Sequence, residues 1–266
     1  RIIAAALRSG GLDSEAVDAT DLIITNDRHG DAAPIMDETR RRSRERLLPL
    51  LERGCVPVVT GFIGATQAGV PTTLGRGGSD YSAAILGDAL DVDEVWFWKE
   101  VDGVMSANPK IVPTARTLPH LSYVEMAELS YYGANVLHPR TVYPVVRRGI
   151  PIRILNTFNP QHPGTLISKT GDTGTAKAVT AIKDVSLITV GGPGMLGLTG
   201  VAGRIFAAVA RGGANTLLIT QASSEQNVCL VVPRADAARA VAELRRELAP
   251  DLSAYDVDHV DLQEPV

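Results

Sequence analysis

The chain has 266 residues, of which 45% are hydrophobic and 21% are charged, and its formal net charge is −4. This composition is typical of a globular protein with one large or two ordinary domains, and it excludes a short disulfide-stapled scaffold. The negative charge argues against nucleic acid as a partner, and no apolar run is long enough to span a bilayer, so we expect no membrane partner either.

The two cysteines, Cys55 and Cys229, lie in strand-like runs, where free thiols usually act as small buried apolar groups. This usage favours a reducing, cytoplasmic location. The sequence starts with Arg1 and an apolar run that lacks the flanks of a signal peptide. We therefore expect the chain to begin inside a larger protein.

Residues 1–167 predict a layered α/β domain. The runs 56–59 and 95–98 are apolar on both faces, as strands of a parallel sheet covered on both sides require. A helix is predicted over 80–90, and a capping box at 122–125 opens another. The arginine-rich stretch 39–53 predicts an amphipathic helix with a solvated basic face, which Pro49 should kink or split.

The stretch 168–177 has small and polar residues without periodicity, so we place a linker at residues 168–182. Beyond it, residues 183–266 predict a second, smaller domain. Its expected elements are a strand at 187–190, a helix at 201–211, strands at 216–220 and 228–232, a helix at 235–248 and a strand at 257–262. This β-α-β-β-α-β order is the ferredoxin-like arrangement.

The most informative motif is TTLGRGGSDYSA at residues 72–83. Its glycines permit positive φ and close approach of a ligand to the backbone, and Ser79 and Asp80 start a helix whose free amides favour an anion. Arg76 has the planar fork that grips a carboxylate. Asp80 can organise cationic groups or hold an amine. A plain strand-to-helix turn with an N-cap serine is the alternative.

Two further clusters follow. The segment VDGVMSANPK at 101–110 leaves a predicted strand at the edge where open α/β sheets bind ligands. Lys110 in it is either a contact to nucleotide phosphates or an ordinary solvated loop lysine. The segment YYGANVLHPRT at 131–141 contains His138, which we expect to be a hydrogen-bonded structural histidine because it has no nucleophile or metal-ligand partner.

Five segments occur in the order GFIG, TTLGRGGSDYSA, VDGVMSANPK, SYVEMAELSYYGANVLHPRT and NTFNPQHPGTLIS. Together they closely resemble the aspartate kinase family, above all its threonine-inhibited members fused to homoserine dehydrogenase. The resemblance implies a three-layer amino-acid-kinase α/β/α sandwich, here partial, followed by an ACT regulatory domain. It also implies ATP-dependent phosphorylation of the β-carboxylate of L-aspartate, the first step toward lysine, threonine and methionine.

The same resemblance implies roles for individual residues. Arg76 would bind an aspartate carboxylate beside Phe62 and Ser79, and Asp80 would be the catalytic residue next to the substrate amine and the transfer centre. ATP with Mg²⁺ would be held by Lys99, Glu100, Met105, Lys110, Asn135 and Val136. Two of these, Met105 and Asn135, depart from the tyrosine and lysine that are usual in the family.

The family's glycine-rich loop with its phosphoryl-stabilising lysine, and a later acidic substrate-binding residue, have no counterpart in this sequence. Phosphoryl transfer depends on neutralising developing charge. We therefore expect this polypeptide by itself to be inactive, although the resemblance implies that its parent protein is a kinase.

The segment 192–197 matches the dinucleotide-binding pattern GxGxxG. Because the next two strands are predicted to form a hairpin and no acidic residue clearly ends the second one, we reject a dinucleotide fold. As an ACT domain, the region would instead bind an amino-acid effector, threonine or lysine. The implied effector-binding residues are Gly194, Met195, Leu196, Asn215 and Gln221. The two amide side chains could alternatively cap strand ends, and pairing of ACT domains implies a homodimer or higher homo-oligomer.

Two other functions stay open. The chain could be a different member of the amino-acid-kinase superfamily that acts on another small acid. It could also be a noncatalytic amino-acid-binding regulatory subunit. A pocket of aspartate size around Arg76 and Phe62 distinguishes the leading hypothesis from the first alternative.

Overall fold

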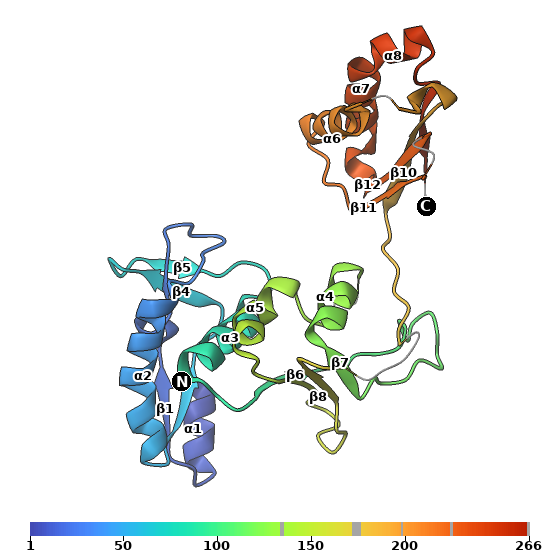
Figure 1. The fold of residues 1–266 in the computed structure, drawn as a ribbon. Helices are drawn as coiled ribbons and strands as arrows, with labels where there is room; N and C mark the ends of the chain where they lie inside the picture. The colour runs from blue at the N-terminus through green and yellow to red at the C-terminus, as the bar shows by residue number, and fades with distance from the viewer. Residues whose placement is uncertain (134–135, 172–176, 198, 224–225, 265–266) are drawn as a thin grey trace. The chain divides into compact units, whose positions relative to one another are not determined.

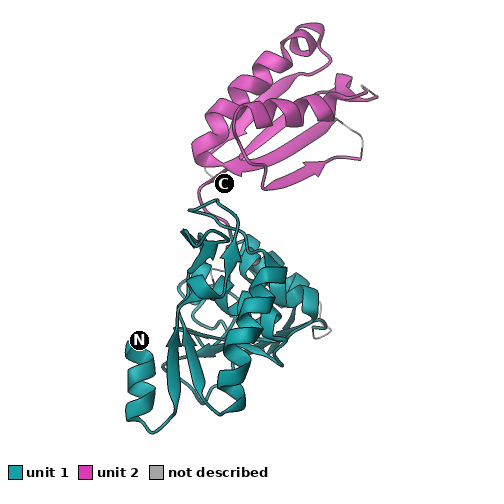
Figure 2. Ribbon diagram, turned by 90° about the vertical axis from the view of Figure 1, so that its left-hand side faces the viewer, with its two compact units in different colours: residues 1–181 teal, residues 182–266 magenta. Residues whose placement is uncertain are grey.

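The computed structural model describes residues 1–133, 136–171, 177–197, 199–223 and 226–264. It divides into two compact units, Arg1–Ala181 and Ile182–Val266, which are coloured separately in Figure 2. Each unit has its own hydrophobic core, so each is described by itself.

The first unit alternates helices and short strands, as the sequence predicts (Figure 1). Its elements are α1 (Ile2–Ser9), β1 (Ser14–Val17), η1 (Ala19–Asp21), β2 (Ile24–Thr25), α2 (Met36–Glu52), β3 (Val56–Val59), β4 (Ile63–Thr66), β5 (Pro71–Thr73), α3 (Gly78–Leu90), β6 (Val95–Lys99), β7 (His120–Ser122), α4 (Tyr123–Tyr131), α5 (Pro139–Arg148), β8 (Ile152–Asn156) and β9 (Thr165–Ser168).

The strands of this unit form a parallel pair β1–β3, a sheet β2-β4-β5 and a sheet β6-β8-β9-β7. In the last sheet β6 runs parallel to β8, with Val95 opposite Ile152, whereas β8 and β9 are antiparallel. The parallel pairing predicted for the strands at 56–59 and 95–98 is confirmed, because β3 pairs parallel with β1 and β6 with β8, whereas β9 adds an antiparallel strand. The chain turns back directly after β8, and a strand that follows so short a turn pairs antiparallel.

Helix α3 is the centre of the first unit, because it packs against both α2 and α5. Ala84 and Ile85 on α3 are fully buried. One face of β6 packs into the core beneath α3 and α5, but Trp96 and Trp98 on its other face are 54% and 45% exposed. The prediction that both faces of this strand are covered is wrong within the described residues.

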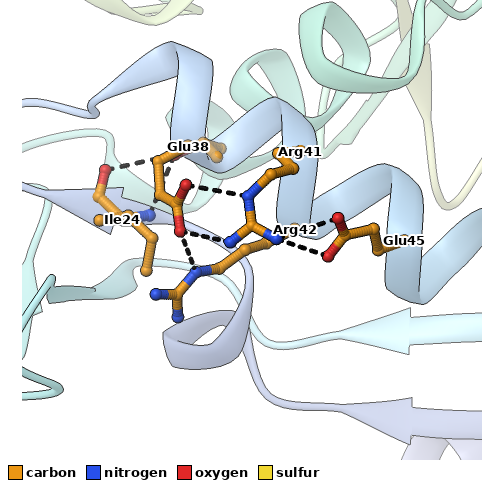
Figure 3. Close-up of polar contacts among 6 residues, drawn as sticks. Ile24, Glu38, Arg41, Arg42 and Glu45 are labelled. Carbon is orange, nitrogen blue, oxygen red and sulfur yellow. Dashed lines mark hydrogen bonds and ion pairs between the residues drawn. The ribbon is translucent and has the colours of Figure 1, made fainter.

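Helix α2 carries its arginines as the sequence predicts, on a solvated and largely paired face. Figure 3 shows Arg41 between Glu38 and Glu45, with N···O distances of 2.7 Å to each carboxylate. Arg42 binds the same Glu38 at 2.7 Å. The helix runs through Pro49 without a break, so the predicted split is wrong. Pro49 lies in the last turn, where a proline removes only one backbone hydrogen bond.

The second unit has the predicted ferredoxin-like order. Its elements are β10 (Val185–Gly191), η2 (Pro193–Met195), α6 (Val201–Arg211), β11 (Leu218–Gln221), β12 (Asn227–Pro233), α7 (Arg234–Glu247), α8 (Ala249–Ala254) and β13 (His259–Gln263). The strands form one antiparallel sheet in the order β11-β12-β10-β13. Ile188 and Leu230 from the sheet pack against Ile205 and Val241 from the two main helices.

The hairpin of β11 and β12 confirms the rejection of a dinucleotide fold, since a Rossmann unit would cross over through a helix at this point. Among the described helices, none combines the length and the apolar character that a membrane crossing requires.

Candidate functional site

The glycine-rich motif forms a tight bend that leads into α3. Gly75 and Gly77 have φ values of +76° and +71°, and Gly77 is the N-cap of the helix. A Cβ on Gly77 would lie 3.1 Å from the Cβ of His138, so the bend also passes close to the start of α5. The N-cap serine of the plain-turn alternative is wrong, because Ser79 lies inside the first turn and is exposed.

A cavity of about 600 Å³ opens beside this bend, and we call it the Arg76 cavity. The bend, the end of β6, the end of α4 and the residues before α5 all contribute to its wall. The lining residues are Arg76, Gly77, Asp80, Lys99, Ser130, Tyr131, Val136, Leu137 and His138. Segments far apart in the sequence therefore meet at one site.

Asp80 and Lys99 form an ion pair inside this cavity. Lys99 Nζ lies 2.5 Å from Asp80 Oδ2, and the two side chains are only 26% and 24% exposed. The ammonium group also lies 5.9 Å from the centre of the Phe97 ring. Partial burial strengthens such a pair compared with one at the open surface.

Arg76 is exposed and, within the described part of the chain, makes neither a hydrogen bond nor an ion pair. Its five N–H donors are free to bind a carboxylate in two-point fashion. The cavity therefore combines one unpaired cation with one cation that is already held by a carboxylate.

The rest of the lining consists of aromatic, apolar and hydroxyl groups. Tyr131 ends α4 and its ring packs edge-on against Tyr132, with 5.1 Å between ring centres. Leu137 is buried. His138 is the N-cap of α5, and its Nδ1 accepts a hydrogen bond from Arg140 N at 3.3 Å, which confirms the predicted structural role.

Several predicted site residues lie outside the lining of this cavity. Phe62 has a left-handed backbone with φ of +77°, and its ring lies against Gly78 at the start of α3. The others outside the lining are Ser79, Glu100, Met105 and Lys110. Met105 bridges to Thr117, and Lys110 is exposed in its loop. Asn135 lies outside the described residues, whereas Val136 lines the cavity.

The loop after β6 is tied to the sheet by Asp102. Its Oδ1 accepts hydrogen bonds from Asn156 at 2.8 Å and Asn159 at 3.0 Å. These two bonds lower the pKa of the Asp102 carboxyl. The start of the predicted nucleotide loop is thereby held against the β8–β9 turn.

Residues 177–181, which immediately precede the second unit, contact both ends of α4. At its first turn, Lys177 Nζ lies 2.6 Å from Glu125 Oε1. At its end, Thr180 Oγ1 donates to Tyr132 O at 2.7 Å. Because α4 supplies Ser130 and Tyr131 to the Arg76 cavity, this segment supports one wall of the site.

The second unit has a cavity of about 370 Å³, which we call the Gln221 cavity. Its lining residues are Met195, Gly197, Thr199, Gly200, Val201, Ala202, Gln221 and Val228. The start of α6 and Gln221 thus line one small space, and they carry backbone and side-chain amides. This arrangement can receive a carboxylate and a polar side chain.

The other predicted effector residues, Gly194, Leu196 and Asn215, lie outside the lining of this cavity. A Cβ on Gly194 would lie 2.6 Å from the carbonyl oxygen of Tyr255, so Gly194 packs against the chain after α8. Leu196 is 63% exposed, and Asn215 is exposed ahead of β11. Of the five predicted residues, the cavity includes Met195 and Gln221.

Ser130, Tyr131 and Leu137 also line the Arg76 cavity, although the sequence analysis assigned them no role. Their only signal was their place within or beside the motif at 131–141. The described residues hold no group of three or more His, Cys, Asp or Glu side chains that could bind a metal ion.

Comparison with known proteins identifies the class to which these two units belong. The profile of the amino acid kinase family matches residues 1–156, and an ACT domain profile matches residues 188–248. The chain therefore belongs to the amino acid kinase family. Its second unit is an ACT domain, which confirms the predicted fold class.

Its relatives carry aspartokinase names. The chain is 39% identical over 270 residues to the bifunctional aspartokinase/homoserine dehydrogenase 1, chloroplastic, of Zea mays. This match covers 98% of the present chain and 29% of the relative. The structure of Escherichia coli aspartokinase III with aspartate and ADP is 33% identical, with a TM-score of 0.70 over 97% of this chain and 57% of that one. The same enzyme with lysine and aspartate gives 32% identity and a TM-score of 0.71, over 98% of this chain and 57% of that one.

Proposed function

We propose that the Arg76 cavity is the substrate side of an aspartate kinase active site, which transfers the γ-phosphoryl group of ATP to the β-carboxylate of L-aspartate. The observation that carries the proposal is the Arg76 guanidinium, which has no partner among the described residues, beside the Asp80–Lys99 ion pair in one cavity. The aspartate and ADP bound by the Escherichia coli relative support this assignment.

In this proposal Arg76 grips the α-carboxylate of aspartate, and Asp80 lies beside its ammonium group. The β-carboxylate is the nucleophile. It is already ionised at neutral pH, because an aspartate side chain has a pKa near 4, so the reaction needs no general base. One carboxylate oxygen forms a bond to the γ-phosphorus while the bond from that phosphorus to the ADP oxygen breaks. Positioning and charge neutralisation then supply most of the rate.

We propose that the nucleotide lies along the loop after β6, near Val136, with Glu100, Met105, Lys110 and Asn135 as further candidate contacts. Asp80 and Glu100 are the candidate carboxylates that would hold Mg²⁺, which would neutralise charge on the phosphates of ATP. Oxygen ligands of this kind suit Mg²⁺.

For the second unit we propose an amino-acid effector at the Gln221 cavity. Threonine and lysine are the candidates, and the lysine bound by the Escherichia coli relative supports an effector of this class. Titration of either amino acid, with Gln221→Ala as the comparison, distinguishes them. We further propose a homo-oligomer that forms through the ACT domains and a cytoplasmic location.

The activity is tested with the purified gene product, ATP and L-aspartate, with hydroxylamine present to trap the acyl phosphate. Aspartyl hydroxamate that forms only with both substrates is the expected result. Replacement of aspartate by glutamate is the matched control, since glutamate differs by one methylene. ATP turnover that ignores aspartate, or that prefers glutamate, would contradict the proposal.

A further inference from the structure

Lys99 is the last residue of β6, and its ammonium group reaches the Arg76 cavity. Side chains alternate between the two faces of a strand. Val95 and Phe97 are buried on the face toward α3, and Lys99 shares that face, whereas Trp96 and Trp98 point the other way. The strand itself therefore directs Lys99 into the cavity.

Asp80 holds this lysine in place. The 2.5 Å contact between Lys99 Nζ and Asp80 Oδ2 joins the end of β6 to the first turn of α3. Both side chains are about three-quarters buried. The Phe97 ring also lies close to the ammonium group, with its centre 5.9 Å from Lys99 Nζ. A lysine that is free in solvent would sample many rotamers, but this one is restricted to the cavity wall.

The two cationic side chains of the cavity, Arg76 and Lys99, suit different anionic groups. Arg76 and Lys99 each carry a positive charge, and Asp80 carries one negative charge. These three side chains therefore have a net charge of +1, which attracts an anion. Arg76 has no partner in the described part of the chain, and its guanidinium suits a planar carboxylate. Lys99 is a compact point charge, which suits the tetrahedral oxygens of a phosphoryl group.

We infer that Lys99 is a catalytic residue that donates hydrogen bonds to the non-bridging oxygens of the γ-phosphoryl group during its transfer, and that Asp80 positions it. This inference rests on the proposed kinase function. As the carboxylate–phosphorus bond forms and the bond to ADP breaks, ADP keeps the electron pair. Lys99 keeps its proton throughout and neutralises charge on the oxygens that belong to neither bond.

The inference predicts a difference between two nucleotides, since ADP lacks the γ-phosphoryl group. Calorimetric titrations with Mg²⁺ would compare ADP with AMP-PNP, an ATP analogue that resists hydrolysis. Lys99→Met should weaken AMP-PNP binding about 10- to 100-fold, the range expected for one charged hydrogen bond, while ADP binding changes less than about 3-fold. Lys99→Arg should keep part of the preference, because it keeps the charge. The matched control is Lys169→Met, which changes an exposed lysine after β9.

The possible outcomes separate the inference from the proposed function. If the wild-type chain binds neither nucleotide, the proposed function fails. If it binds both and Lys99→Met weakens them equally or not at all, Lys99 does not contact the γ-phosphoryl group and the inference fails alone. The affinity of Lys99→Met for ADP also reports that the variant is folded. In turnover assays of the full gene product, Lys99→Met should lower kcat and leave the KM for aspartate unchanged.

Discussion

Glu125 and Lys177 form an ion pair, with 2.6 Å between Oε1 and Nζ, that ties the segment before the second unit to the first turn of α4. Glu125 also accepts hydrogen bonds from Ser122 N and Ser122 Oγ at 2.7 and 2.8 Å. The far end of the same helix carries Tyr131 into the Arg76 cavity. The Glu125 carboxylate thus holds the segment 177–181 in place and supports the helix that forms one wall of the candidate site.

Glu125→Gln should lower the free energy of unfolding by about 1 kcal/mol at neutral pH, since glutamine preserves part of the capping box but not the charge that faces Lys177. Burial acts to raise the pKa of Glu125, but Lys177 and Ser122 outweigh it and lower the pKa from 4.5 to about 2. The carboxylate therefore stabilises the fold fully above pH 4.5, and this contribution is lost as the pH falls toward 2.

Thermal unfolding of both proteins from neutral pH to about pH 2 checks this prediction. The difference in Tm should shrink as the pH falls. Glu128→Gln is the matched control, because Glu128 is an exposed glutamate on the same helix. A Tm difference that stays constant down to the lowest pH would show that the charge of Glu125 does not matter.

Asp88→Asn should destabilise the first unit by about 2 kcal/mol, because it removes the charge of a largely buried carboxylate that two arginines share. The Asp88 side chain is 9% exposed and lies 3.1 Å from Arg40 and 3.6 Å from Arg148. Urea unfolding measures the loss. Asp37→Asn is the control, since Asp37 is fully exposed at 3.8 Å from Arg40 and should cost less than about 0.5 kcal/mol. Equal losses of stability in Asp88→Asn and Asp37→Asn would show that burial of the Asp88 carboxylate does not matter.

Comparing Gly164→Ala with Gly149→Ala distinguishes the cost of a left-handed backbone from the cost of a steric clash of the new Cβ. Their φ values are +70° and +69°, but a Cβ on Gly164 would lie 2.0 Å from the carbonyl oxygen of Ile154, whereas a Cβ on Gly149 meets nothing within 4 Å. Gly149→Ala should cost about 1 kcal/mol for the left-handed backbone. Gly164→Ala should cost about 3 kcal/mol or more, because the β8–β9 turn must also move. Similar unfolding midpoints in urea would contradict this difference.

Local patterns predicted many elements of this fold. The helix expected at 201–211 is α6, the strand expected at 56–59 is β3, and the capping box of α4 is present. Short elements were missed. β4 and β5 lie in a stretch rich in glycine and threonine that is typical of turns, and α5 contains Pro144, which argues against a helix.

The sequence predicted individual residues of the candidate site better than the contacts between them. Arg76 and Asp80 come from a single bend and were found together, while the partner of Asp80 was not. Lys99 was expected to bind nucleotide, and its ion pair with Asp80 depends on how β6 packs beneath α3. Tyr131 likewise reaches the cavity through the packing of α4, which no local pattern of residues reveals.

Aspartate binding by the Arg76 cavity is tested most directly by calorimetric titration of L-aspartate into the wild-type chain, Arg76→Ala and Arg147→Ala. Arg147 is exposed at the far end of α5 and serves as the matched control. Wild type and Arg147→Ala should bind one aspartate with the same affinity, and Arg76→Ala should bind at least about 10-fold more weakly, as the loss of a charged hydrogen bond requires. Equal aspartate affinity in folded Arg76→Ala and wild type would contradict the assignment of this site.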